Sequence, residues 1–201
     1  MITFTDGQLT LIPGFVVLIP AAILAARIWR RDAGGRADHA RTLMELLALA
    51  HVSAVIALTI FPIPIAGQEF YRLTRGMTED NLVPFGTISW QLTHLRLNTI
   101  FQLVGNMVVL GPLGVYGPAL WPALRDWRRF LLVAIAFGVG IELTQLAGSV
   151  LEGFTYRVTD VDDAIMNATG AMVGFAAWPW IAAEYRHRTE PVEPVARRPA
   201  S

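Results

Sequence analysis

The chain has 201 residues, of which 54% are hydrophobic and 16% are Asp, Glu, Lys or Arg, and its mean hydropathy is +0.47. Because a typical soluble domain has about 25% charged residues, this composition excludes a water-soluble globule and a disordered chain. The net charge is zero and cysteine is absent, which gives no reason to expect nucleic acid as a partner and excludes disulfides and thiolate chemistry.

A bilayer-spanning helix needs roughly 20 mostly apolar residues, and five stretches of the chain meet this requirement. Hydrocarbon offers no partners for backbone N–H and C=O groups, so each stretch is expected to be a helix. We therefore predict an all-α fold, a polytopic bundle of about five transmembrane helices. The predicted spans are residues 9–28, 46–65, 99–120, 130–151 and 164–183.

The spans divide the chain into three parts. Residues 1–8 are predicted to be an extracytoplasmic N-terminus, residues 9–183 the transmembrane domain, and residues 184–201, which are charged and rich in proline, a disordered cytoplasmic tail. The loop before the third span carries apolar residues at a spacing that favours a short helix in the outer interface. These residues are Ile88, Trp90, Leu92 and Leu95.

Arginine counts predict the orientation. Residues 27–41, 121–129 and the tail after Glu184 carry 5, 3 and 4 arginines, whereas the alternate loops together carry 4. Arginine-rich loops stay in the cytoplasm, so the N-terminus is expected outside and the C-terminus inside. No basic residue precedes the first apolar run, which therefore reads as a retained helix and not as a cleaved signal peptide.

Polar residues inside the predicted spans are the strongest functional signal. An ionisable side chain at the centre of a membrane helix costs about 2.5–3.5 kcal/mol, and Glu142 lies about 14 Å from the outer end of the fourth span at 1.5 Å per residue. Glu142 and Gln145 share one side of that helix, and Asp163 and Asn167 share one side of the fifth. We expect these stripes to converge with Asn106 of the third span.

The predicted site is a hydrated cleft that opens outward. Its floor is Glu142, and its rim is formed by Arg157, Asp160 and Asp163. Structural roles stay open for several residues: Asn106 and Asn167 as interhelical hydrogen-bond partners, an Arg157–Asp160 salt bridge within the loop, and Asp residues as helix caps. Capping is our main interpretation of Asp162, packing that of His51, and close helix contact that of Gly170 and Gly174.

Four blocks of the sequence resemble the VanZ-like membrane proteins. They are Asn81-Leu82-Val83-Pro84-Phe85, Gly105-Asn106 with Pro112 and Gly114, Glu142 with Gln145, and the series Arg157, Asp160, Asp163, Asn167, Gly170 and Gly174. Leu110 departs from the family pattern, which usually has Phe there. The founding member is associated with low-level teicoplanin resistance, so the resemblance implies a bacterial cytoplasmic membrane protein of the cell envelope and selects these residues, without implying a reaction.

Two main functions are compatible with the sequence. The first is binding of a membrane lipid, a lipid-linked envelope precursor or the acyl chain of a lipoglycopeptide, which would lower teicoplanin susceptibility; its ligand-binding residues would be Asn81, Pro84, Phe85, Asn106, Glu142, Gln145, Arg157, Asp160, Asp163 and Asn167. The second is an intramembrane enzyme acting on such a lipid.

For the enzyme, Glu142 would be an acid or base, or Asp160 and Asp163 would hold a divalent cation. No other cofactor is predicted, and the oligomeric state is left open. A proton-coupled transporter that uses Glu142 as its relay is a weaker alternative, since the polar residues are confined to the outer half of the predicted bilayer. A purely structural membrane protein is the remaining alternative.

Overall fold

We describe the protein from a computed structural model. The structure describes residues 2–5, 8–11, 36–59, 63–64, 80–155 and 157–189, with side chains for 41–59, 80–155 and 157–183. Most of the first predicted span, from residue 12 onward, lies outside the described residues, as does the tail from residue 190.

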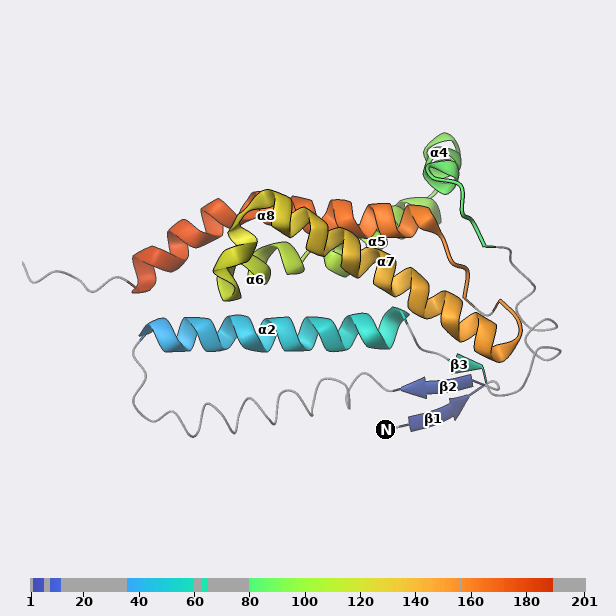
Figure 1. Ribbon diagram of the computed structural model, residues 1–201, viewed down its shortest axis with the longest axis horizontal. Helices are drawn as coiled ribbons and strands as arrows, with labels where there is room; N and C mark the ends of the chain where they lie inside the picture. Colours follow the sequence, from blue (N-terminus) through green and yellow to red (C-terminus); the bar gives the residue numbers. More distant parts are fainter. Residues whose placement is uncertain are drawn as a thin grey trace, which may run out of the picture.

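The described chain is a helical bundle, as predicted (Figure 1). Its centre is the long C-terminal helix α8, which packs against α5, α6 and α7, while α2 lies alongside α6 and α8. The elements are α2 (Arg36–Thr59), α4 (Gly86–Thr93), α5 (Leu97–Leu110), α6 (Leu113–Leu120), the 3₁₀ turn η1 (Pro122–Arg125), α7 (Trp127–Glu152) and α8 (Val161–Thr189).

A small antiparallel sheet lies at one end of α2, and it corrects two predicted boundaries. Its strands, in spatial order, are β1 (Ile2–Thr5), β2 (Gln8–Leu11) and β3 (Ile63–Pro64). The second predicted span was wrong at its end, since α2 stops at Thr59, because Pro62 and Pro64 disfavour helix at and before their positions. The start of the first predicted span was wrong too, since its residues up to Leu11 pair as a strand.

Three described helices are long and apolar enough to cross a membrane: Arg41–Thr59 of α2, Leu97–Leu120 of α5 with α6, and α7. Helix α8 has the length but is not among them. Its less apolar composition reflects Asn167 and the glycines that face its neighbours, where burial against protein replaces contact with lipid. It also extends past the predicted end at Ala183, to Thr189.

Helix α8 approaches the α5–α6 junction with no side chain between the two backbones. A Cβ atom on Gly170 would lie 1.8 Å from the carbonyl oxygen of Met107, and one on Gly174 would lie 2.0 Å from that of Gly111. Neither distance is physically accessible, so only glycine permits this packing. The interpretation of Gly170 and Gly174 as a close helix contact is confirmed.

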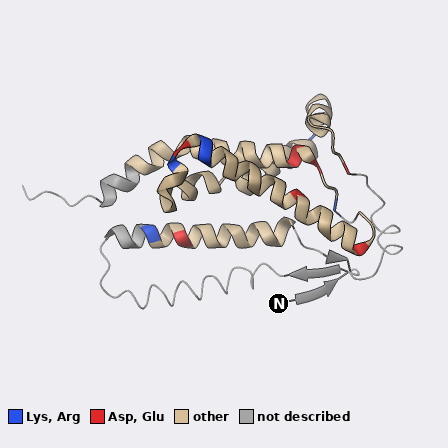
Figure 2. Cartoon of the chain, viewed as in Figure 1, with Lys and Arg blue, Asp and Glu red and all other residues tan. Residues whose placement is uncertain are grey.

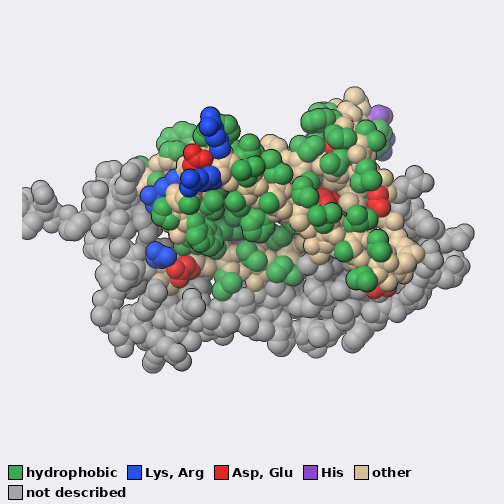
Figure 3. Space-filling view, in the orientation of Figure 1, with side chains coloured by type: hydrophobic (Ala, Val, Ile, Leu, Met, Phe, Trp, Pro, Cys, Tyr) green, Lys and Arg blue, Asp and Glu red, His purple; other side chains and the backbone are tan. Residues whose placement is uncertain are grey.

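The outer surface of the bundle is apolar, in contrast to its partly polar interior. Large side chains such as Leu132, Leu143 and Val173 are exposed, and hydrophobic side chains cover much of the described surface (Figure 3). Inside, Phe130 is fully buried and stacks on Phe175 with ring centroids 4.7 Å apart. This distribution is that of a protein whose solvent is lipid.

Candidate functional site

The predicted polar residues meet at one end of the bundle, which we call the polar end: Asn81, Asn106, Glu142 and residues 159–163. The backbone N–H of Asp160 donates a hydrogen bond to Glu142 Oε2 at 2.9 Å, and Asn106 Nδ2 donates to Asp163 Oδ1. The bundle therefore joins α5, α7 and α8 at this point. Figure 2 shows acidic residues of α7 and α8 here and most of the described arginines at the opposite end.

Asp160 connects the polar end to the segment before α4. Its carboxylate accepts hydrogen bonds from Asn81 Nδ2 at 2.9 Å and from the Thr87 hydroxyl at 2.6 Å. The backbones are joined as well, since Asn81 N–H donates to the Thr159 carbonyl at 2.9 Å and Val161 N–H donates to the Asn81 carbonyl at 3.0 Å. Asn81 and Asp160, which lie 79 residues apart in the sequence, thus form one parallel β-bridge.

Asp162 is a helix cap, but the helix it caps is α4. Its side chain is 1% exposed, and its two oxygens accept the backbone N–H groups of Phe85 at 2.5 Å and Ile88 at 2.9 Å. These are two of the N–H groups that the first turn of a helix leaves without a partner. An aspartate from α8 therefore does what a local capping residue does elsewhere.

Gln145 and Arg157 stabilise the end of α2. Gln145 Nε2 donates to the Thr59 carbonyl at 3.0 Å, and Arg157 donates from its guanidinium to the Leu58 carbonyl at 2.9 Å. The last carbonyls of a helix have no intrahelical partner, and a cation near them also interacts favourably with the helix dipole. The Arg157 backbone carbonyl in turn accepts a hydrogen bond from Ser149.

Asn167 differs from Gln145 and Arg157 because one of its polar atoms lacks a hydrogen-bond partner within the part of the chain that the structure describes. The side chain is 3% exposed, and its Oδ1 has no hydrogen-bond partner among the described residues. A buried carbonyl oxygen without a donor is destabilising by about 1–3 kcal/mol. Asn167 precedes Gly170 by one helical turn, so this free acceptor lies close to the α5–α8 contact.

The polar end is closed. Three carboxylates are buried there, those of Glu142, Asp160 and Asp162. Both oxygens of Asp160 and of Asp162 accept hydrogen bonds, and Oε2 of Glu142 accepts one. Pro84 and Phe85, which the sequence also selects, are exposed on the outside of the capping segment. Within the described residues, no three His, Cys, Asp or Glu side chains are grouped so as to hold a metal ion.

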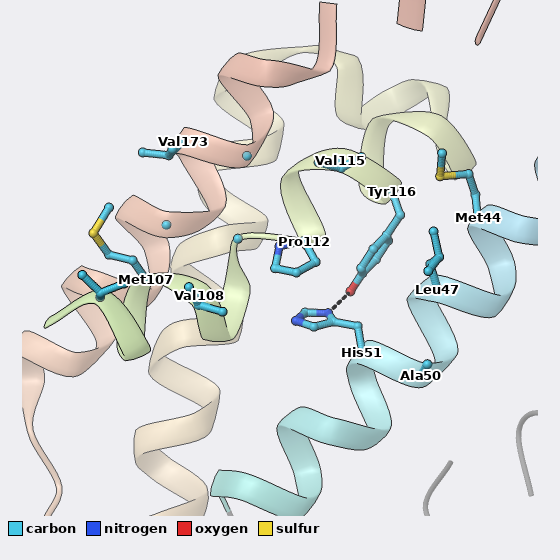
Figure 4. Close-up of a pocket in the computed structure, with 14 residues that line it drawn as sticks. Met44, Leu47, Ala50, His51, Met107, Val108, Pro112, Val115, Tyr116 and Val173 are labelled. Carbon is cyan, nitrogen blue, oxygen red and sulfur yellow. Dashed lines mark hydrogen bonds between the residues drawn. The ribbon is translucent and has the colours of Figure 1, made fainter. Parts of the chain in front are cut away.

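An open apolar groove of about 930 Å³ runs between α2 on one side and α5, α6 and α8 on the other (Figure 4). Its size falls within the range of about 300–1,000 Å³ typical of small-molecule sites. The lining of the groove also includes the backbone of three glycines, Gly111, Gly170 and Gly174. The apolar side chains in its lining include Met44, Leu47, Met107, Val108, Val115 and Val173.

His51 and Tyr116 are polar side chains that point toward each other in this groove (Figure 4). His51 Nδ1 lies 3.0 Å from the Tyr116 hydroxyl, and Nε2 lies 2.7 Å from the Val109 carbonyl. Because a carbonyl only accepts, Nε2 carries the proton and Nδ1 accepts from Tyr116. The interpretation of His51 as a packing residue agrees with these contacts, which join α2 to α5 and α6.

The fold and the polar end together define an integral membrane helical bundle. In this bundle, hydrogen bonds join the start of α8 to the segment that precedes α4. A family model described as VanZ/LLP1 matches residues 48–182, which is more than half of the chain. The protein belongs to this VanZ-like family. No curated protein and no solved structure matches the chain.

Sequence reasoning missed three participants in the polar end: Thr87, Thr159 and Asp80. Thr87 donates to Asp160, and the Thr159 N–H donates to the Asp80 carboxylate at 2.8 Å. For Thr87, the sequence did offer a signal, because Thr87 follows the Asn81–Phe85 block by only two residues. Gln102, which lies one turn before Asn106 on α5, is exposed.

Proposed function

We propose that the protein is a multi-pass protein of the bacterial cytoplasmic membrane that lowers susceptibility to teicoplanin by holding the acyl chain of an envelope amphiphile. The observation that carries this proposal is the apolar groove between α2, α5, α6 and α8. The amphiphile is a membrane lipid, a lipid-linked envelope precursor or the lipoglycopeptide itself. These share one chemistry, a long apolar chain attached to a polar head group.

The groove suits such a chain because of its lining and its surroundings. Three of its four helices, α2, α5 and α6, belong to segments with the length and hydropathy of membrane spans, so its contents come from the hydrocarbon layer. Met44 and Met107 are flexible apolar side chains that adapt to a ligand of variable shape. The polar groups of His51 and Tyr116 bond to each other and to Val109, so neither demands a polar ligand atom.

The head group is proposed to lie toward the polar end. Asn106 directly precedes the groove residue Met107, and Asn167 lies one turn from Gly170. The unpaired Oδ1 of Asn167 is buried, so it would accept a hydroxyl or amide donor of the ligand only after the helices around it move apart. Six further residues support the site by holding the helices and the loop in place: Asn81, Glu142, Gln145, Arg157, Asp160 and Asp163. Pro84 and Phe85 lie on its outer surface.

The first experiment compares antibiotic susceptibility in a sensitive Gram-positive host that expresses wild-type protein or Val173→Trp, with membrane levels matched by immunoblot. Val173 lines the groove, and tryptophan there would fill it. Val139→Trp is the matched control, since Val139 is exposed on α7 and does not line the groove. Teicoplanin, which carries an acyl chain, is compared with vancomycin, which does not.

We expect wild type and Val139→Trp to raise teicoplanin tolerance several-fold and Val173→Trp to abolish the increase, with little change toward vancomycin. Native mass spectrometry of the purified proteins then tests for a bound lipid that Val173→Trp loses. Equal tolerance in all three strains and no bound lipid in wild type would overturn the proposal. Loss of tolerance in Glu142→Gln with the lipid still bound would instead favour the enzyme.

A further inference from the structure

The segment that carries α4 exposes large apolar side chains beside the buried polar end. We call this set the apolar rim: Leu82, Val83, Phe85, Trp90, Leu92 and Leu95. Each of them is more than half exposed. Clusters of exposed apolar side chains of this kind mark interaction surfaces, and α4 stands out to the side of α5 and α8 (Figure 1).

Phe85 is held in a backbone conformation that phenylalanine rarely adopts. Its φ of 66° is left-handed, which costs of order 1–3 kcal/mol for a residue other than glycine. The bond from its N–H to Asp162 helps to hold this conformation, and the ring is left 61% exposed. Glycine would adopt the same backbone without strain, so the exposed ring stands at a position where it carries a conformational cost.

The rim is continuous with surface that faces lipid. Helix α5 begins four residues after α4 ends, and its first turns expose Leu97, Ile100 and Phe101. Since α5 and α6 form one of the three membrane-length spans, these side chains contact hydrocarbon. Arg96, which is exposed, is the only charged residue between positions 81 and 101. An apolar surface with a single cation matches the phosphate and upper acyl region of a phospholipid layer.

We infer that the apolar rim inserts into the membrane–water interface at the polar end, with Arg96 against lipid phosphate. The ligand is the phospholipid of the bilayer, and Asp162 is the positioning residue that holds Phe85 and α4 in the inserted orientation. This interaction is separate from the groove, since none of the rim residues lines it. It ties the closed polar end to the membrane surface.

The chain has no cysteine, so a spin label attached to a single introduced cysteine reacts at that position alone. Phe85→Cys and Leu92→Cys report on the rim, while Arg128→Cys and Glu152→Cys report on exposed charged positions at the two ends of α7. The full chain is spin-labelled and reconstituted in vesicles of phosphatidylcholine and phosphatidylglycerol. Accessibility to oxygen, which concentrates in lipid, is compared with accessibility to a water-soluble nickel chelate.

Labels at 85 and 92 are expected to be several-fold less accessible to nickel than labels at 128 and 152, and more accessible to oxygen. Equal accessibilities at all four positions would overturn the inference. Phe85→Gly then tests the ring alone, because it keeps the backbone conformation. In that background the label at 92 should become more accessible to nickel, and an unchanged value would exclude the ring as an anchor.

Arg96→Gln tests the head-group contact in the same assay. In wild type, the label at 92 should be better shielded from nickel in vesicles that contain phosphatidylglycerol than in phosphatidylcholine alone. Arg96→Gln should remove that difference and leave the neutral vesicles unaffected. A difference that persists in Arg96→Gln would overturn the assignment of Arg96 to lipid phosphate.

Discussion

The polar end and the apolar groove lie along the same helix, α8, yet they are built in opposite ways. At the polar end, Asp160 and Asp162 are buried and bonded to a segment about 80 residues earlier in the chain. In the groove, apolar side chains and glycine backbone border open space of about 930 Å³. The ionisable residues therefore hold the helices and the loop together, and the space for a ligand lies a few helical turns away along α8.

The physical reason lies in what burial demands of each kind of group. A buried carboxylate or backbone N–H without a partner is strongly destabilising, so polar groups in a bundle assemble with one another. Apolar side chains have no such requirement, and in a membrane they can face lipid or a ligand with little difference in free energy. Substitutions should therefore be costly at the polar end and mild in the groove.

The largest loss of stability is expected from Asp162→Ala. It removes the acceptor of two backbone hydrogen bonds and leaves the Phe85 and Ile88 N–H groups unpaired, which should lower the free energy of unfolding by about 3 kcal/mol. The measurement is unfolding by SDS in mixed micelles. Asp162→Asn keeps one carbonyl acceptor and should lose about half as much; a wild-type value for Asp162→Ala would refute the cross-helix cap.

The next largest effect is expected from Gly138→Ala. A Cβ atom there would lie 2.8 Å from the Ala164 carbonyl oxygen, so α7 and α8 must separate, at a cost of about 2 kcal/mol. Gly140→Ala is the matched control on the same helix, because nothing lies within 4 Å of its Cβ. The control should be neutral or stabilising by up to about 1 kcal/mol. Equal effects of the two substitutions would contradict the close α7–α8 contact.

A smaller effect should follow from Glu142→Ala, which leaves the buried Asp160 N–H without its acceptor. The free energy of unfolding should fall by about 1–2 kcal/mol. Glu142→Gln keeps a carbonyl oxygen for this bond, so its stability should stay within about 1 kcal/mol of wild type. A loss in Glu142→Gln as large as that in Glu142→Ala would show that the carboxylate charge matters beyond the hydrogen bond.

The smallest effect is expected from Val173→Trp in the groove. Val173 is exposed, and the added ring has open space to occupy, so the free energy of unfolding should change by no more than about 0.5 kcal/mol. The same variant is the one expected to lose teicoplanin tolerance. A loss of several kcal/mol would mean that the groove is packed in solution, and the contrast with the polar end would disappear.

Much of this arrangement was accessible from single residues and their spacing. The long uncharged runs predicted the spans that became α2, α5 with α6, and α7, and the small residues Gly170 and Gly174 predicted a close helix contact. The positions of Glu142, Asp163 and Asn106 predicted that their helices meet. The resemblance of four short blocks also led to the family.

What the sequence by itself determined is that the chain belongs in a membrane and that its polar residues must gather, because both follow from the free energy of moving side chains into hydrocarbon. Only the tertiary structure decided which donors those residues meet. Asp162 caps α4, and Gln145 and Arg157 cap α2, pairings between distant segments that no local pattern encodes. The groove is likewise a property of packing, since its apolar residues look the same in sequence as any that face lipid.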